Sequence, residues 1–286
     1  MYTKTYKENV EIVYSIVIPV YNQENCIIEN LKSIISNTLQ SFEIIIILDY
    51  CFDHTEKNLL LFLENYTTNP DNLCEIIVFK NEEKPLFETK CDNIGFKHSR
   101  GKYCLEIQAD MKMTEFGYNI QLTKPFDLYD NVIAVSGRCA HNLYFNGAGM
   151  GKLGREIENT IDELNITRNK FYVYETCNRG PLLLDKRKLS EMNYLDEDNY
   201  FLDDSDHDLM ARAYIEKGYI CGYVPIDFYA PLVLGSTRNH NTYDFCKEYF
   251  VNKNEKERLQ NEKKDGLNKY RNIWKNRKPV TYDLHP

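Results

Sequence analysis

Two aspartates lie at or just beyond the ends of largely apolar runs of the sequence, at places where a carboxylate could do chemistry. Asp49 follows the run Phe42–Leu48 and could accept a hydrogen bond from a ring N–H of a nucleobase. Asp110 follows the run Tyr103–Ile107 and could bind Mg²⁺ or Mn²⁺, hard cations that prefer oxygen ligands. Each also has a structural alternative, because aspartates after strands commonly form turns or cap the next helix.

A third acidic segment, Asp203-Asp204-Ser205-Asp206-His207-Asp208, opens a predicted helix that runs to Gly218. Its four carboxylates repel one another, and a helix N-terminus would be satisfied by one or two of them. The surplus indicates a role as general base, metal ligand or partner of sugar hydroxyls. A solvated acidic cap is the alternative.

Two loops carry weaker signals. Residues 235–240, with Arg238 and His240 among hydroxyl side chains, could hold a diphosphate and its metal, although an exposed polar loop has the same composition. Residues 147–154 imitate a glycine-rich phosphate loop but lack both a strand leading into them and the ending of a P-loop. We expect them to form a flexible loop over a cleft.

The elements that must position these residues alternate between strand and helix. Apolar runs predict strands at 14–20, 42–48, 75–79 and 103–107, and helical spacing predicts helices at 25–37, 55–66 and 88–99. This alternation predicts a parallel sheet covered by helices on both faces. Ligands of such sheets gather beyond the carboxyl ends of the strands, where Asp49 and Asp110 would lie.

The second half of the sequence is less regular. Its patterns predict a strand at 131–137, a helix at 206–217 and a strand at 219–224. Residues 139–180 show few clear elements, as is common on the acceptor side of a cleft. Residues 242–278 are charged and predicted to be helical.

The body of the chain is acidic, whereas a C-terminal segment is basic. The formal net charge is −8, and residues 252–278 carry ten Lys/Arg against four Asp/Glu, so the remainder carries −8 − 6 = −14. An acidic body argues against a nucleic-acid binder, which needs a basic face. The basic segment could lie on an anionic membrane or hold a second subunit, and a solvated helix packed on the body is the alternative.

The cysteines and the apolar segments indicate a compartment. Nine cysteines are scattered without a CxxC pair, which predicts buried thiols in a reducing environment. The polar N-terminal segment argues against a secretory signal, and no apolar stretch approaches the roughly 20 residues of a membrane span. We therefore expect a cytoplasmic protein, with peripheral membrane contact through the basic segment as an option.

Taken in order, these segments resemble glycosyltransferase family 2, inverting enzymes of the GT-A fold. Tyr14–Asn22 looks like the first strand of the family with its Pro-x-Tyr-Asn turn. Phe42–Thr55 looks like its second strand and the aspartate-rich motif that reads uracil. Asn93-Ile94-Gly95 and Arg100–Tyr103 are similar to the stretch that leads into the metal motif, and Gln108-Ala109-Asp110 falls on that motif.

The resemblance extends into the second half, over roughly residues 12–240. Arg179-Gly180-Pro181-Leu182 resembles the start of the acceptor-side segment, and Asp206, six residues before Arg212, falls where the family places its catalytic base. The resemblance implies base catalysis by Asp206, nucleotide binding by Pro19, Tyr21, Asp49, Asn93, Gln108 and Ala109, metal binding by Asp110 and His240, and acceptor or diphosphate contacts by Arg179, His207, Asp208 and Arg238. It also implies Mn²⁺ or Mg²⁺, a UDP-sugar donor and a glycan, protein or small-molecule acceptor.

The resemblance further implies an α/β, mostly parallel sheet flanked by helices, with an irregular acceptor-side region. We expect a catalytic domain over 1–240, divided into a nucleotide-binding half at 12–112 and an acceptor-binding half at 113–240. A charged, mostly helical extension would follow at 241–286. A homo-oligomer is compatible with this organisation.

The departures from the family pattern keep other functions open. Gln108 replaces the first aspartate of the metal motif, Leu48 replaces the first aspartate of the nucleotide motif, Asp92 stands where many members have arginine, and Ser205 replaces a glutamate beside the base. A degenerate relative that binds nucleotide or glycan without catalysis is therefore an alternative. A nucleotidyltransferase would carry a Gly-rich, basic loop after its first strand, a composition that residues 21–24 lack.

Overall fold

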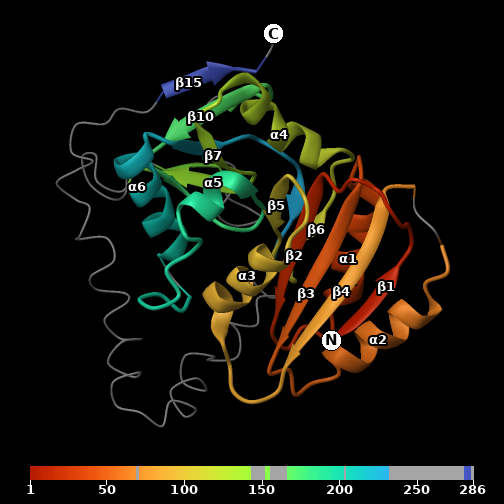
Figure 1. The fold of residues 1–286 in the computed structure, drawn as a ribbon. Coiled ribbons are helices and arrows are strands. Elements are labelled where there is room, and N and C mark those ends of the chain that lie inside the picture. Colours follow the sequence, from red (N-terminus) through yellow and green to blue (C-terminus); the bar gives the residue numbers. More distant parts are fainter. Residues whose placement is uncertain (69–70, 143–151, 155–165, 203, 232–279, 285–286) are drawn as a thin grey trace.

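The computed structural model describes residues 1–68, 71–142, 152–154, 166–202, 204–231 and 280–284, which form a ten-stranded sheet with helices on both faces (Figure 1). In spatial order the strands are β1 (Tyr2–Thr5), β4 (Leu73–Asn81), β3 (Phe42–Asp49), β2 (Tyr14–Val20), β5 (Tyr103–Glu106), β12 (Leu182–Asp185), β7 (Val132–Ser136), β13 (Ile220–Tyr223), β10 (Lys170–Tyr174) and β15 (Val280–Asp283). The predicted α/β class is thus confirmed.

The direction of the strands places the ends of the first four at a common edge. Strands β4, β3, β2 and β5 are mutually parallel neighbours, and Tyr14 of β2 is in register with both Phe42 and Tyr103. In the whole sheet β1, β12 and β10 run opposite to the other seven described strands. The sheet is therefore mostly parallel, as predicted.

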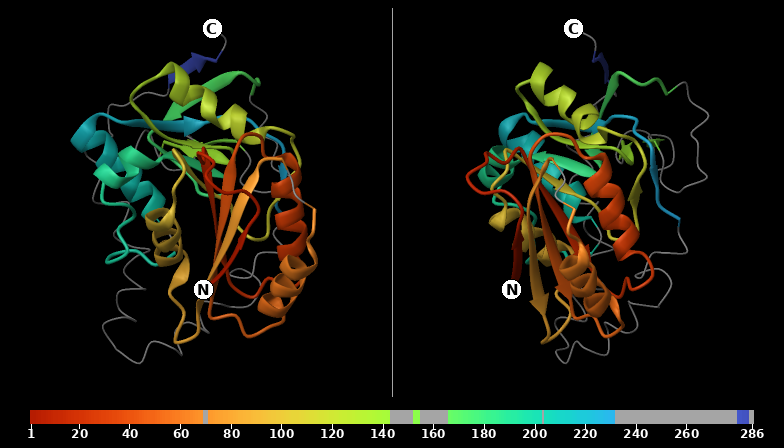
Figure 2. Two further views of the ribbon diagram at one scale, coloured as in Figure 1. Left: turned by 45° about the vertical axis from the view of Figure 1, so that its right-hand side comes forward. Right: turned by 90° about the vertical axis from the view of Figure 1, so that its right-hand side faces the viewer.

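The alternation of side chains along the strands builds one core on each face. Ile16 and Ile18 of β2 point into the first core, whereas Val17 between them points into the second. The first core contains side chains of α1 (Ile27–Asn37), α2 (Thr55–Asn65) and α4 (Tyr118–Leu128), and the second those of α3 (Phe87–His98), α5 (Lys186–Glu191) and α6 (Ser205–Lys217). Figure 2 shows α1 and α2 on one side of the sheet and α3 with α6 on the other.

The elements of the first half match the sequence prediction closely. Strand β2 has the predicted bounds, and α1, α2 and α3 each lie within about two residues of theirs. Strand β3 is buried along its whole length, from Phe42 to Asp49, because its isoleucines serve both cores alternately. Burying each such side chain contributes about 1.5–3 kcal/mol, so this run dictates a central strand.

The described part of residues 139–180 contains several short strands that the sequence pattern did not indicate. Besides β10 it contains β8 (Cys139–His141), β9 (Lys152–Gly154) and β11 (Thr176–Cys177), which form a three-stranded sheet in the order β11-β8-β9. Strands of two or three residues give no readable alternation. A further pair joins β6 (Lys112–Met113) to β14 (Phe228–Tyr229).

Several predicted features lie outside the described residues. These are the helical segment 242–278 with its basic stretch, and the glycine-rich loop 147–154 apart from the three residues of β9. The division into 1–240 and 241–286 stays a prediction. Among the described helices, none is both long and apolar enough to cross a membrane, and the eight described cysteines form no disulfide.

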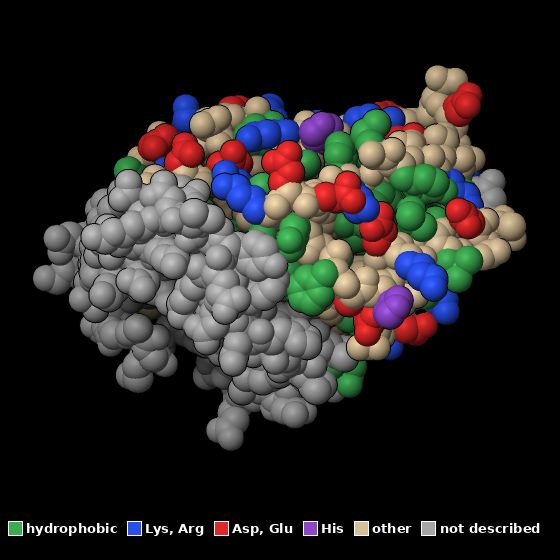
Figure 3. All heavy atoms as spheres, turned by 90° about the horizontal axis from the view of Figure 1, so that it is seen from below, with side chains coloured by type: hydrophobic (Ala, Val, Ile, Leu, Met, Phe, Trp, Pro, Cys, Tyr) green, Lys and Arg blue, Asp and Glu red, His purple; other side chains and the backbone are tan. Residues whose placement is uncertain are grey.

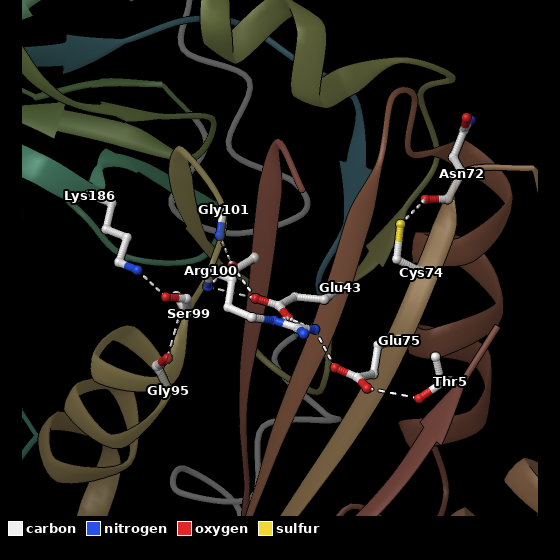
Figure 4. Close-up of polar contacts among 11 residues, drawn as sticks. Thr5, Glu43, Asn72, Cys74, Glu75, Gly95, Ser99, Arg100, Gly101 and Lys186 are labelled. Carbon is white, nitrogen blue, oxygen red and sulfur yellow. Dashed lines mark hydrogen bonds and ion pairs between the residues drawn. The ribbon is translucent and has the colours of Figure 1, made fainter. Parts of the chain in front are cut away.

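A cluster of charged residues closes the amino-end edge of the parallel strands (Figure 4). The buried carboxylate of Glu43 accepts hydrogen bonds from Ser15 Oγ at 2.6 Å, Arg100 N at 2.8 Å and Arg100 Nε at 2.7 Å. Arg100 also pairs with Glu75, which accepts from Thr5. A Cβ on Gly101 would lie 2.7 Å from Ser15 N, so only glycine fits this turn. Each carboxylate here has partners, and the cluster ties β1, β2, β3 and β4 together.

Candidate functional site at the carboxyl ends of the strands

Asp49 ends β3 at the edge opposite Arg100, and its carboxylate is used within the protein. Leu86 N and Phe87 N donate to it at 2.9 Å, and Asn81 Nδ2 donates at 2.7 Å. Burial raises the pKa of Asp49 in spite of these bonds. The carboxylate therefore positions the loop that leads into α3, a role that the sequence did not reveal.

Asp206 lies in the first turn of α6 with only 6% of its surface exposed. Arg179 N donates to Oδ2 at 3.1 Å, and His207 N donates to Oδ1 at 2.9 Å. Burial alone would raise the pKa of Asp206, but His207, Arg179 and the two N–H donors together hold it below its ordinary value. Helix N-termini stabilise anions in the same way. Asp206 is therefore an oriented and ionised carboxylate at neutral pH.

Arg179 lies in the segment before β12, and its guanidinium is buried among carboxylates. Nη1 donates to Asp92 Oδ2 at 2.9 Å, Nη2 lies 3.5 Å from Glu88 Oε2, and Nη2 also donates to the carbonyl of Leu202. Burial opposes the ionisation of Arg179, but the charges of Glu88, Asp92 and their neighbours raise its pKa overall. A charge that is both buried and paired stays ionised.

Three carboxylates converge beside this guanidinium. Glu88 and Asp92 come from α3 and Glu106 ends β5, and one oxygen from each lies within 4.8 Å of the others. Burial, together with the charge of Glu88, raises the pKa of Asp92 to about 8 against the lowering effect of Arg179. Burial and the charges of Asp92 and Glu88 raise the pKa of Glu106 well above its ordinary value. This group is called the acidic triad below.

The turn after β5 carries the residues of the predicted metal motif. Asn30 of α1 holds this turn by donating to the carbonyls of Gln108 at 3.0 Å and Met111 at 2.7 Å. The Gln108 amide donates to Glu88 at 2.9 Å and accepts from Arg138 at 3.1 Å. The side chain of Gln108 therefore links α3 to the turn between β7 and β8, and its amide is used within the protein.

Asp110 is the one carboxylate of the predicted metal motif. It is half-buried and near Cys26, whose pKa is raised to about 12 by burial and, to a smaller extent, by the charge of Asp110. Mg²⁺ and Mn²⁺ that bridge a diphosphate need as little as one protein carboxylate, because phosphate oxygens and water complete their shell. The residues present therefore fit such an ion through Asp110.

The other predicted nucleotide residues have varied surroundings. Pro19 and Tyr21 are half-buried around the carboxyl end of β2, and the Tyr21 ring lies edge-on to Phe52 at 6.1 Å. Ala109 is buried in the turn after β5. The buried amide of Asn93 donates to Leu195 O at 2.9 Å and to Glu197 at 2.6 Å, so it holds the segment before α6.

Of the residues predicted to contact the acceptor or the diphosphate, Asp208 is used within the protein and His207 is half-buried. Asp208 is bonded to Arg212 Nε at 2.6 Å and to the hydroxyl of Tyr200 at 3.4 Å, contacts that fix α6 on its surroundings. His207 is half-buried, and its ring lies 5.6 Å from that of His141 in an edge-on arrangement. Arg238 and His240, predicted for the diphosphate and the metal, lie outside the described residues.

Hydrogen bonds and an ion pair connect the segments that carry the three predicted carboxylates at this edge. Asp49 holds the start of α3 through Phe87 N, and Glu88 in the first turn of this helix contacts both Gln108, in the turn that carries Asp110, and the guanidinium of Arg179. Arg179 N in turn donates to Asp206. Seen from this edge, the described surface carries acidic and basic side chains that are interspersed (Figure 3). The structure thus brings Asp49, Asp110 and Asp206 to the same edge of the sheet.

Sequence reasoning missed the acidic triad and Arg138. Glu106 was read as part of an apolar strand and Asp92 as a lost arginine, and neither inference considered that they meet. A usable signal was present: Glu88 and Asp92 are four residues apart on a predicted helix, so they share one face. A glutamate inside an otherwise apolar strand also requires a buried partner.

Three solved structures show what fold this chain has. The chain is similar to residues 1–349 of TarS from S. aureus, with a TM-score of 0.51 and 15% identity over 77% of this chain and 60% of that one. It is also similar to GalNAc-T7 in complex with UDP, GalNAc and Mn²⁺, with a TM-score of 0.57 and 16% identity over 77% of this chain and 43% of that one. A third similar structure is the mannosyltransferase PcManGT from Pyrobaculum calidifontis in complex with GDP-Man and Mn²⁺, with a TM-score of 0.52 and 13% identity over 76% of this chain and 56% of that one. The chain thus spans about half the length of these proteins, and the likeness defines a GT-A fold.

The sequence itself narrows this class to one family. The model of glycosyl transferase family 2 matches residues 15–177, which is more than half of the chain. The chain therefore belongs to glycosyl transferase family 2, as the resemblance implied. No curated protein matches the sequence.

Proposed function

We propose that this protein transfers a sugar from a UDP-sugar to an acceptor hydroxyl with inversion, and that Asp206 is the general base. The family membership supports sugar transfer. A TarS structure holds UDP-GlcNAc and the GalNAc-T7 structure holds UDP, which supports a uridine donor, whereas PcManGT holds GDP-Man. The acceptor is a glycan, a protein or a small molecule.

The observation that carries the proposal is the state of Asp206. Its two oxygens each accept one main-chain N–H, so the carboxylate is fixed in orientation and ionised, with further lone pairs left for an acceptor. An inverting transfer needs such a base on the acceptor side, because the hydroxyl must lose its proton as it attacks. The position at the strand-end edge is where ligands of open α/β sheets bind.

In the proposed reaction Asp206 takes up the proton that the acceptor loses. The acceptor hydroxyl gives its proton to Asp206, its oxygen bonds to the anomeric carbon, and the bond from that carbon to the diphosphate oxygen breaks to release UDP. Asp110 would hold a Mn²⁺ or Mg²⁺ ion, which when bound neutralises charge on the departing diphosphate. Tyr21 and Pro19 would contact the base, and Asp49 would act by positioning the loop before α3.

Replacing Asp206 tests the proposal. Asp206→Asn keeps the shape of the side chain but removes the base, so transfer should fall by about 10²–10⁴-fold. UDP affinity, measured by calorimetry with and without Mn²⁺, should change little. Asp198→Asn, an exposed aspartate in the segment before α6, is the matched control and should transfer like the unmodified protein. Undiminished turnover by Asp206→Asn across UDP-, GDP- and dTDP-sugars would remove Asp206 from this role.

The second candidate function is nucleotide or glycan binding without catalysis. The bonded Gln108 amide favours it, because only Asp110 of the predicted motif offers the metal a carboxylate. Calorimetry and donor-hydrolysis assays over the same donor panel separate the two functions. UDP binding without turnover of any donor would establish the binding function and exclude the transferase.

A further inference from the structure

We propose that the acidic triad Glu88, Asp92 and Glu106 binds one divalent, oxygen-preferring cation, Ca²⁺ or Mn²⁺, independently of any nucleotide. This site is distinct from the ion expected at Asp110, which shares its coordination with a diphosphate. Asp110 is not a member of the triad, and in the turn that carries Asp110 it is the Gln108 amide that donates to Glu88.

The oxygens of the triad have the spacing that a cation of this size requires. Three oxygens at the corners of a triangle with 4.8 Å sides surround a point that is about 2.8 Å from each, and the triad lies within that limit. Ca²⁺ binds oxygen at about 2.3–2.6 Å, so a contraction of a few tenths of an ångström suffices. Mg²⁺, at about 2.0–2.1 Å, would need a larger movement.

Two buried oxygens of the triad lack a hydrogen-bond partner among the described residues. They are Asp92 Oδ1 and Glu106 Oε1, and both side chains are fully buried. The other oxygen of each is used, because Asp92 Oδ2 accepts from Arg179 and Glu106 Oε2 accepts from Gly180 N at 2.6 Å. Buried carboxylate oxygens without partners are costly, and a cation would satisfy them together.

The charges of the cluster also balance with one divalent ion. Once a cation has displaced their protons, the three carboxylates carry −3 and the Arg179 guanidinium carries +1, so one divalent ion would neutralise the buried cluster. The guanidinium contacts Asp92 through Oδ2 and so leaves Oδ1 to the ion. Glu88, whose side chain is 21% exposed, offers a path from solvent.

The experiment uses the full chain without nucleotide and measures the melting temperature with EDTA, Ca²⁺, Mn²⁺ or Mg²⁺. At a cation concentration about 100-fold above Kd, Ca²⁺ or Mn²⁺ should raise the melting temperature by roughly 5 °C. The shift should disappear in Glu106→Gln and in Asp92→Asn. It should persist in Asp110→Asn and in Glu75→Gln, which removes a carboxylate from the arginine cluster at the other edge.

Equilibrium dialysis with Mn²⁺ gives a second measurement that does not depend on melting. We expect one bound ion per chain, retained in Asp110→Asn and lost in whichever triad variants fold. Absence of both a shift and a bound ion would overturn the proposal, and so would a shift lost in Asp110→Asn but kept in Glu106→Gln. Because neither measurement involves a donor sugar, failure here leaves the proposed transferase function standing, and the reverse also holds.

Discussion

The two edges of the parallel sheet each contain one arginine among carboxylates, and they differ in how completely those carboxylates are paired. At the amino-end edge, both oxygens of Glu43 accept hydrogen bonds and Arg100 is half exposed. At the carboxyl-end edge, the buried Arg179 faces the acidic triad and Asp206, with two oxygens left without partners among the described residues. The first cluster fixes strands, whereas the second keeps buried carboxylate oxygens without a hydrogen-bond partner among the described residues.

This difference separates stability from function along one sheet. A buried carboxylate with every oxygen bonded contributes to folding, and its neighbours need no further ligand. Carboxylates that share one cation in a buried place repel one another, and such groups concentrate at functional sites. Charged clusters at the two edges should therefore respond to substitution in opposite ways, which can be measured.

The largest expected effect comes from removing one arginine at each edge. Arg179→Gln would leave the buried carboxylates around it uncompensated and should lower the free energy of unfolding by about 3–5 kcal/mol. Arg100→Gln should cost less, about 1–2 kcal/mol: its own side chain is 53% exposed, but the buried Glu43 Oε2 loses the Nε donor. Urea unfolding in EDTA measures both. Equal costs for the two substitutions would contradict the comparison.

The central strands and the helices between them could be predicted from the sequence because each is decided by its own residues. The apolar run of β3 and the helical spacing of α1 need no partner to be recognised. Asp110 and Asp206 could also be picked out as candidates from the sequence, because the end of a strand and the start of a helix are local features. Their placement at the same edge follows from parallel register and short connections.

The acidic triad and the contacts of Asp49 could not be read in the same way, because they depend on packing between distant segments. Asp49 meets Phe87 only when α3 begins at the end of β3, 38 residues later in the chain. Glu106 accepts from Gly180, 74 residues away, only once β12 has joined β5. Such encounters depend on how elements dock, which no local pattern encodes.

A smaller effect is expected from replacing a fully bonded carboxylate at the amino-end edge. Glu43→Gln replaces one carboxylate oxygen with an NH₂ group, which cannot accept a hydrogen bond from Arg100. The free energy of unfolding should fall by about 2 kcal/mol, or the melting temperature by roughly 5 °C. Sugar transfer per folded molecule should be unchanged, because this edge is remote from Asp206. Glu75→Gln, on the more exposed side of Arg100, is the control and should cost less. Loss of transfer in stable Glu43→Gln would show that the amino-end edge also serves function.

The pH dependence of stability should reveal the retained proton on Asp92 at the carboxyl-end edge. The pKa of Asp92 is about 8 in the folded chain against an ordinary value of 3.8, so between these values the folded chain holds a proton that the unfolded chain has released. The free energy of unfolding should therefore fall as pH rises toward about 8, and Asp92→Asn should reduce this slope. Asp206 acts in the opposite direction, since its lowered pKa gives stability that is lost as pH falls through the folded value. Urea unfolding in EDTA from about pH 5 to 8 measures the slope, and parallel curves for the two proteins would exclude the proton on Asp92.

The smallest expected effect, and the sharpest test of the carboxyl-end edge, is Gln108→Glu. The new carboxylate keeps its contact with Arg138 but loses the hydrogen bond to Glu88 and places a further negative charge beside the triad. In EDTA the variant should be about 1 kcal/mol less stable, from the lost bond and the added repulsion. With Mn²⁺ or Ca²⁺ the variant should instead be more stable than the unmodified protein, because a fourth carboxylate strengthens cation binding. The rise in melting temperature on adding the cation should therefore be larger for the variant. Gln121→Glu in α4 makes the same chemical change away from the triad and should do neither. If Gln108→Glu is equally destabilised with and without the cations, the charge at this edge is compensated within the protein, and the two edges differ only in burial.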